Sequence, residues 1–166
     1  MSGKHGPVPL EKYLNIHQSA MASHLKLGFV IDDGVQFDVV RSHAVYQLAG
    51  RIQCAGQLTL DVRKVLEVTG REGRVQFVQT VEYTYHAQLG KVREVFRYCG
   101  PHEEGHNDEH HVHRFDVLGS GKQLADSPTF LIHEEERPTL GEVIEELHRW
   151  HDTHGDDAAR LLASFD

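Results

Sequence analysis

The sequence is poor in several features, and each shortage excludes a class of protein. Its 166 residues include two cysteines, Cys54 and Cys99, too few for the disulfide framework of a small secreted domain. No apolar run approaches the roughly 20 residues that span a bilayer. The first ten residues lack the basic-then-apolar pattern of a signal peptide. We therefore expect a cytoplasmic protein with no membrane partner.

Positive charge is also scarce. There are 17 lysines and arginines against 25 acidic residues, which gives a net charge of −8 with histidine neutral. A broad surface for non-specific nucleic-acid binding needs the opposite sign and is excluded, whereas a small local basic site or a basic partner protein is not. Histidine is the exception to this scarcity, because 14 imidazoles can become charged near pH 6.5.

The length fits one domain that buries a core without a structural metal. We find no internal repeat and no second domain. The sequence predicts a single α+β domain over residues 1–166, with a core of about 9–152 and a polar, histidine-rich loop at 100–111.

Helical periodicity marks both ends of the chain. Residues 9–26 carry apolar side chains at helical spacing, with Pro9 where a first turn tolerates proline. The motif Thr139-Leu140-Gly141-Glu142 is a capping box that opens a second helix. We expect that helix to end before His154, and a short final helix near 157–165. Three histidines spaced by three are interpreted as an exposed polar helix face: His148, His151 and His154.

Between the helices the apolar pattern has a period of two, as in half-buried strands. The even positions from Leu58 to Val68 are apolar, with Lys64 as the exception. Further extended segments are expected at 29–40, 45–54, 75–86, 91–99 and 112–118, followed by a linker at 119–137. The predicted fold is an antiparallel β-sheet meander packed by an N-terminal helix and C-terminal helices.

One predicted hairpin brings chemically useful residues together. A two-residue turn at Leu89-Gly90 pairs Tyr83 with Phe96 and Val81 with Tyr98, which makes one face aromatic. The same register gathers polar side chains on the opposite face: Glu82, His86, Arg93 and Arg97.

Five histidines form a candidate catalytic cluster near this hairpin: His86, His102, His110, His111 and His113. Histidine is the usual side chain for proton transfer near neutral pH, and an adjacent arginine can hold phosphoryl charge. With Arg93 or Arg97 the set resembles equipment for phosphodiester cleavage, in which one imidazole takes a proton and another gives one. The alternative is a solvated acidic loop that is rich in histidine by chance.

The same cluster offers a metal site as a further alternative. His111 and His113 on one strand, with His86 or His102 and a carboxylate, could bind zinc or iron. A cupin-type barrel would also need a glutamate a few residues later, and Asp116 falls on the wrong strand face. We place acid–base use first and expect no cofactor. If a metal binds, the expected ligands are His86, His111 and His113.

An ordered set of motifs carries a family resemblance: Tyr83-Thr84-Tyr85-His86, Phe96-Arg97-Tyr98, Pro101-His102, His110-His111-Val112-His113 and Pro138-Thr139-Leu140. The set resembles the TumE-like toxins of bacterial and archaeal toxin–antitoxin pairs. Their pattern runs Tyr-Ser-Tyr-His, Arg-Tyr-Asp-Asn-Ala-Pro-His-His, His-His-x-His and a C-terminal Pro-x-Thr/Ser-Leu helix. The resemblance covers about residues 10–150.

The resemblance implies a small prokaryotic toxin with ribonuclease activity, neutralised by a helix-turn-helix antitoxin protein. Carried over by position, the candidate catalytic residues are Tyr83, Tyr85, His86, Arg97, His102, His111 and His113, with Tyr98 as a further match. The RNA's own 2′-hydroxyl is the expected nucleophile, so that the mechanism needs no metal. RNA and the antitoxin are the expected partners, with a homodimer as an additional option.

The chain departs from the family pattern inside the candidate site. Cys99-Gly100 replaces Asp-Asn-Ala, and Glu103 replaces the second histidine after Pro-His. The acidic stretch 103–109 would also repel a phosphate backbone. Two alternatives therefore stay open, namely a non-catalytic, degenerate toxin-like binding module and a histidine-ligated metal-binding enzyme.

Overall fold

The computed structural model describes residues 5–100, 110–131 and 136–165. These residues form strands and helices in the order β1 (Val8–Pro9), α1 (Leu10–Lys26), β2 (Val30–Asp33), β3 (Gln36–Arg41), β4 (Val45–Cys54), the short 3-10 helix η1 (Ala55–Gln57), β5 (Leu58–Glu72), β6 (Val75–Leu89), β7 (Arg93–Gly100), β8 (His110–Arg114), β9 (Thr129–Leu131) and α2 (Leu140–Ala163). In this part of the chain, no helix has both the length and the apolar character needed to cross a membrane.

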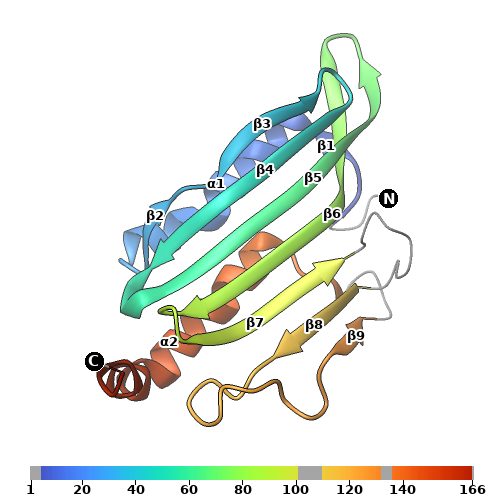
Figure 1. Ribbon diagram of the computed structural model, residues 1–166. Coiled ribbons are helices and arrows are strands. Elements are labelled where there is room, and N and C mark those ends of the chain that lie inside the picture. The colour runs from blue at the N-terminus through green and yellow to red at the C-terminus, as the bar shows by residue number, and fades with distance from the viewer. Residues whose placement is uncertain (1–4, 101–109, 132–135, 166) are drawn as a thin grey trace.

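The strands form one antiparallel sheet in which β4 to β9 are neighbours in chain order (Figure 1). Strands β2 and β3 both pair with β4 at one edge, and β1 pairs with β6. The longest strands, β5 and β6, run for 15 residues each through the middle of the sheet. The α+β fold with an antiparallel meander, predicted from the sequence, is confirmed.

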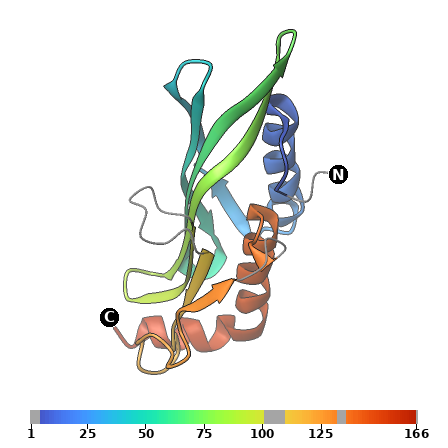
Figure 2. The same ribbon diagram turned by 90° about the vertical axis from the view of Figure 1, so that its right-hand side faces the viewer.

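Both helices cover the same face of the sheet, here called the helix face; the opposite side is the outer face (Figure 2). Because side chains alternate along a strand, neighbouring rows of cross-strand partners point to opposite faces. One row is buried beneath the helices: Val62, Tyr85, Tyr98 and Val112. The adjacent row therefore lies on the outer face: Asp61, His86, Arg97 and His113.

The capping box predicted for the second helix is present. The Thr139 hydroxyl accepts a hydrogen bond from the amide of Glu142 at 3.2 Å, and the Glu142 carboxylate accepts one from the amide of Thr139 at 3.1 Å. These two hydrogen bonds pair backbone donors of the first turn and fix the start of α2 at Leu140. The start of α2 lies next to α1.

Helix α2 then continues for 24 residues, so the predicted end before His154 and the separate last helix are wrong. A helical glycine costs only about 1 kcal/mol relative to alanine. The ring of His151 lies close to Gly155, 3.4 Å from where a β-carbon would stand. The apolar face continues past this point with the buried Ala158, so packing on the sheet outweighs the weak local signal.

The predicted register of the β6–β7 hairpin is also wrong. Tyr83 pairs with Gly100 instead of Phe96, a shift of four residues, and Tyr85 pairs with Tyr98. A bulge next to Ala87 and a turn at residues 90–92 take up the difference. Beyond the bulge the shift is even, so Phe96, Arg97 and Tyr98 stay on the faces expected for them. Before the bulge the shift is odd: Arg93 pairs with Leu89 of the core instead of joining His86, so its predicted place on the outer face is wrong, and Glu94 lies beside His86.

The last predicted strand is shorter than expected, and the linker after it holds a strand. β8 ends at Arg114 because the chain turns at Asp116, whose carboxylate accepts a hydrogen bond from the amide of Ser120 at 2.9 Å. Within the predicted linker, β9 pairs antiparallel with β8 and forms the edge of the sheet.

Candidate active site

Four of the predicted site residues come together on the outer face, where β6, β7 and β8 run side by side. His86 is the cross-strand partner of Arg97, and Arg97 is the partner of His113. Neighbouring strands lie about 4.8 Å apart, so Arg97 stands between two histidines whose backbones are about 10 Å apart. His111 joins them from β8, with its ring centroid 4.9 Å from that of His113.

A carboxylate orients the first histidine. Nε2 of His86 lies 2.8 Å from Oε1 of Glu94, which is close enough for a strong hydrogen bond. The bond fixes the ring and leaves Nδ1 as the nitrogen for proton transfer. This arrangement of an imidazole held by a carboxylate is common in acid–base sites.

Two further carboxylates, Asp61 in the row and Glu82 near it, are each paired with an arginine: Asp61 with Arg51 at 2.7 and 3.1 Å, and Glu82 with Arg63 at 2.7 Å. Exposed ion pairs of this kind add little to stability. Their effect is on charge, because they neutralise the carboxylates next to the row. Among the described residues, Arg97 has no carboxylate partner and is the unneutralised cation of the row.

Two nitrogen atoms of the row are buried without a hydrogen-bond partner among the described residues, namely Nε of Arg97 and Nδ1 of His113. An unsatisfied buried polar atom costs about 1–3 kcal/mol and calls for an explanation such as a functional role. Burial, Arg97 and the neighbouring His111 lower the pKa of His113. At neutral pH this ring is therefore neutral and able to accept a proton.

Cys99 also belongs to this cluster, although the sequence did not predict it as a site residue. It is buried, it is the cross-strand partner of His111, and one ligand atom each from Cys99, His111 and His113 lies within 4.8 Å of the others. Burial raises the pKa of the Cys99 thiol, and Arg97 opposes that rise. Thiolate and imidazole are the ligands of many zinc sites, so this donor set differs from the predicted one by holding Cys99 in place of His86.

Tyr83 and Tyr85 do not join the cluster, although the sequence placed them in the same site. Both are 2% exposed on the helix face, where they line a cavity. The Tyr83 hydroxyl lies 3.0 Å from Nδ1 of His110, so this histidine also points to the helix side. Burial raises the pKa of Tyr83. The sheet itself separates these groups from His86, and the predicted His102 lies outside the described residues.

Comparison with known proteins gives no relative for this site. No family model, no curated protein and no solved structure matches the chain.

Proposed function

We propose that this protein is a toxin-type ribonuclease that cleaves RNA by metal-independent acid–base chemistry, with a helix-turn-helix antitoxin as its partner. The row on the outer face is the observation that supports this function: Arg97, which has no carboxylate partner among the described residues, stands between His86 and His113. A phosphodiester placed over Arg97 would have an imidazole on each side. The ordered motifs shared with TumE-like toxins support the same assignment.

The chemistry assigns one role to each residue of the row. Neutral His113 takes the proton from the 2′-hydroxyl as that oxygen attacks phosphorus and forms a new P–O bond. The bond from phosphorus to the 5′-oxygen breaks, and His86 gives that oxygen a proton. Arg97 binds the non-bridging oxygens as their charge grows. The products are a 2′,3′-cyclic phosphate and a 5′-hydroxyl end.

A basic antitoxin fits the net charge of −8. An antitoxin that covers the outer face would block the row and screen its acidic surroundings. We expect the two proteins to co-purify, and the ribonuclease activity to fall as the complex forms.

The decisive experiment incubates the purified protein with total RNA and tRNA, with and without EDTA. A His86→Ala/His111→Ala/His113→Ala variant is compared with His154→Ala, a control on the far part of α2. We expect cleavage that survives EDTA, leaves cyclic phosphate ends and disappears in the triple variant only. An oligonucleotide with 2′-deoxyribose at the cleaved position should resist.

Cleavage by the triple variant at the wild-type rate would contradict this mechanism. No cleavage by the wild-type protein would also contradict it, and would favour the toxin-like module that binds a partner without cutting RNA.

The donor set Cys99, His111 and His113 favours a second candidate, a zinc-dependent hydrolase. Three protein ligands leave a fourth tetrahedral position for water, which the metal can activate as a nucleophile. Metal analysis of untagged protein tests this candidate: about one zinc per chain, lost in Cys99→Ser, with cleavage abolished by EDTA, is the expected result. Cleavage that is indifferent to EDTA in zinc-free protein would contradict it.

A further inference from the structure

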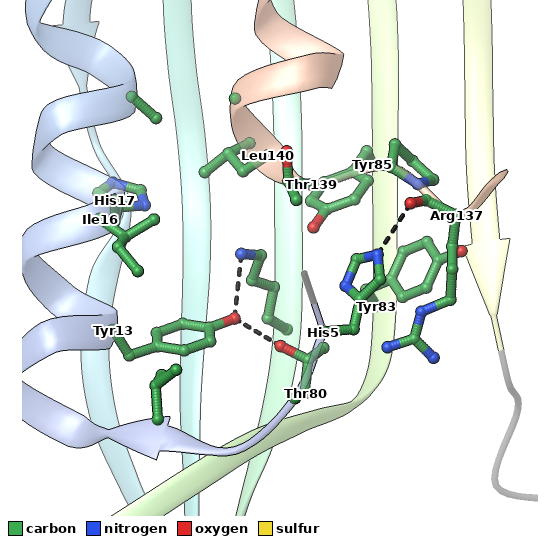
Figure 3. Close-up of a pocket in the computed structure, with 16 residues that line it drawn as sticks. His5, Tyr13, Ile16, His17, Thr80, Tyr83, Tyr85, Arg137, Thr139 and Leu140 are labelled. Carbon is green, nitrogen blue, oxygen red and sulfur yellow. Dashed lines mark hydrogen bonds between the residues drawn. The ribbon is translucent and has the colours of Figure 1, made fainter. Parts of the chain in front are cut away.

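The helix face holds a cavity of about 180 Å³ between α1, the start of α2 and the strands β5 and β6 (Figure 3). Its wall combines aliphatic side chains with tyrosine hydroxyls and cationic groups. An apolar cavity of about 150 Å³ in another protein takes up benzene, so this one has room for a molecule with a body of that size.

Lys64 supplies a positive charge to the cavity from a position in the core. Only 8% of the residue is exposed, and Leu60, Val62 and Leu66 occupy the neighbouring positions on the same face of β5. Its Nζ donates a hydrogen bond to the Tyr13 hydroxyl at 3.0 Å and lies 5.0 Å from the centroid of that ring. Among the described residues, no carboxylate forms an ion pair with it.

This charge persists at neutral pH although it is buried. Burial by itself lowers the pKa of Lys64, but the neighbouring oxygens of Tyr85 and Tyr13 outweigh that effect and raise it. The tyrosine hydroxyls therefore stabilise the ammonium, but they do not neutralise its charge. In a site with so little water, a bound anion would interact with this charge more strongly than it would at the surface.

Further nitrogen atoms in the cavity wall also need partners. Nδ1 of His17 and Nε of Arg137 are buried without a hydrogen-bond partner among the described residues. Nε2 of His17 is held by Asp33 at 2.8 Å, which leaves Nδ1 for another group. The described residues that line the cavity include a lysine, an arginine and two histidines but no aspartate or glutamate, in a protein whose net charge is −8.

Hydroxyls and apolar groups complete the wall. As Figure 3 shows, the Tyr13 hydroxyl forms a hydrogen bond with Oγ1 of Thr80, at 2.5 Å. The same hydroxyl accepts the hydrogen bond from Nζ of Lys64. The apolar part is made of aliphatic side chains: Val8, Ile16, Ala20 and Leu140. A phosphate or sulfate would offer too many oxygens for such a wall, whereas a carboxylate joined to a hydrocarbon body matches both halves.

We propose that this cavity binds a small monocarboxylic acid, with its carboxylate at Lys64 and a hydrocarbon body of about benzene's size against Ile16 and Leu140. Tyr13 positions the ammonium, and Arg137 and His17 supply further polar contacts. The site lies on the opposite side of the sheet from the proposed ribonuclease site and does not depend on it.

The test measures thermal unfolding and calorimetric binding with benzoate and hexanoate as probes. Benzyl alcohol and benzylamine serve as neutral and cationic controls of similar shape, and inorganic phosphate tests for a general anion site. We expect the melting temperature to rise with benzoate or hexanoate concentration, and to stay constant with the three controls.

Two variants place the binding at Lys64. Lys64→Met keeps the length of the side chain and removes its charge, and should weaken benzoate binding about ten- to a hundredfold. Tyr13→Phe removes only the hydroxyl and should weaken it less. Lys91→Met, the same substitution in the exposed β6–β7 turn, should bind benzoate like the wild type.

Several outcomes would overturn the proposal. Equal stabilisation by benzyl alcohol would show an apolar cavity without an anion site, and stabilisation by phosphate alone would show a different ligand class. Unchanged benzoate affinity in a folded Lys64→Met variant, or no response of the wild type to either carboxylate, would also contradict it. RNA cleavage is scored separately, so the failure of one proposal leaves the other standing.

Discussion

Each face of the sheet contains buried nitrogens that have no hydrogen-bond partner among the described residues, but the surroundings of these nitrogens differ. On the outer face, Arg97 and His113 lie among carboxylates that are already paired with cations, and no helix of the described chain covers this surface. On the helix face, Lys64 lies among hydroxyls and aromatic rings beneath two helices. The difference is one of access: the outer face is open to a polymer such as the RNA of our proposal, whereas the groups of the helix face surround a cavity of about 180 Å³.

The largest expected effect tests the catalytic half of this comparison. His113→Ala and His86→Ala should each slow RNA cleavage by about 10²–10⁴-fold, the usual contribution of a general acid or base. Each variant should remove a different limb of the bell-shaped pH–rate profile, because one residue acts as base and the other as acid. Initial rates across pH 5–9 would measure both; loss of the same limb in both variants would contradict the assigned roles.

The next prediction concerns which face holds the fold together. Leu147→Ala, at a fully buried position of α2 on the helix face, should lower the free energy of unfolding by about 2–5 kcal/mol. Asp61→Ala breaks the exposed pair with Arg51 on the outer face and should lower it by at most about 1 kcal/mol. Urea unfolding of both variants measures the difference. Equal losses would mean that outer-face ion pairs matter as much as core packing.

A smaller effect measures how much the buried lysine contributes to the fold. Lys64→Met should lower the free energy of unfolding by about 1 kcal/mol, because the raised pKa of Lys64 means that the folded protein favours the ammonium, and because Tyr13 loses a hydrogen bond. The control Lys91→Met should change it by less than about 0.5 kcal/mol. A gain of stability in Lys64→Met would show that burying the charge costs more than its hydrogen bonds contribute.

The smallest expected effect is a pH dependence where the two helices meet. Burial lowers the pKa of His24; His148, whose Nδ1 lies 2.7 Å from that of His24, lowers it further, and Glu145 partly opposes both. The unfolded chain therefore binds this proton first, and stability is lost as the pH falls through about 6.5.

The measurement compares urea unfolding of the wild type and His24→Phe at pH 7.5 and 5.5. The wild type should lose more stability than the variant, by at most about 1.4 kcal/mol per pH unit, which is the limit for one proton. Equal losses in the two proteins would show that His24 does not contribute.

Local patterns predicted most of the fold, because the strand period of two and the helical period of the apolar residues were both clear in the sequence. The alternation from Leu58 onward and the capping box at Thr139 each depend on residues that are close in the sequence. The register of β6 and β7 could not be predicted, since a bulge next to Ala87 changes the count without changing the pattern. The length of α2 was missed for a similar reason, because tertiary packing carries the helix through Gly155.

The candidate site was predicted in part. Strand parity placed His86 and Arg97 on one face, and the same parity would have added Cys99 if it had been counted together with Arg97. Lys64 was noticed only as an exception to an apolar stripe. The role of Lys64 depends on its hydrogen bond to the hydroxyl of Tyr13, a residue of α1 that lies 51 positions earlier in the chain. No local sequence pattern predicts a contact over that distance.

Strand β6 contributes side chains to both faces of the sheet from alternate positions. Tyr83 and Tyr85 lie on the helix face, and Thr84 and His86 lie on the outer face. During evolution, substitutions can change the outer-face row and the helix-face cavity independently of each other. Both, however, depend on the number of residues in β6. Gain or loss of a single residue within β6 would turn the tyrosines outward and His86 into the core, so both sites would be lost together. We therefore expect insertions and deletions in descendants of this chain to collect at the ends of β6 and to spare its centre.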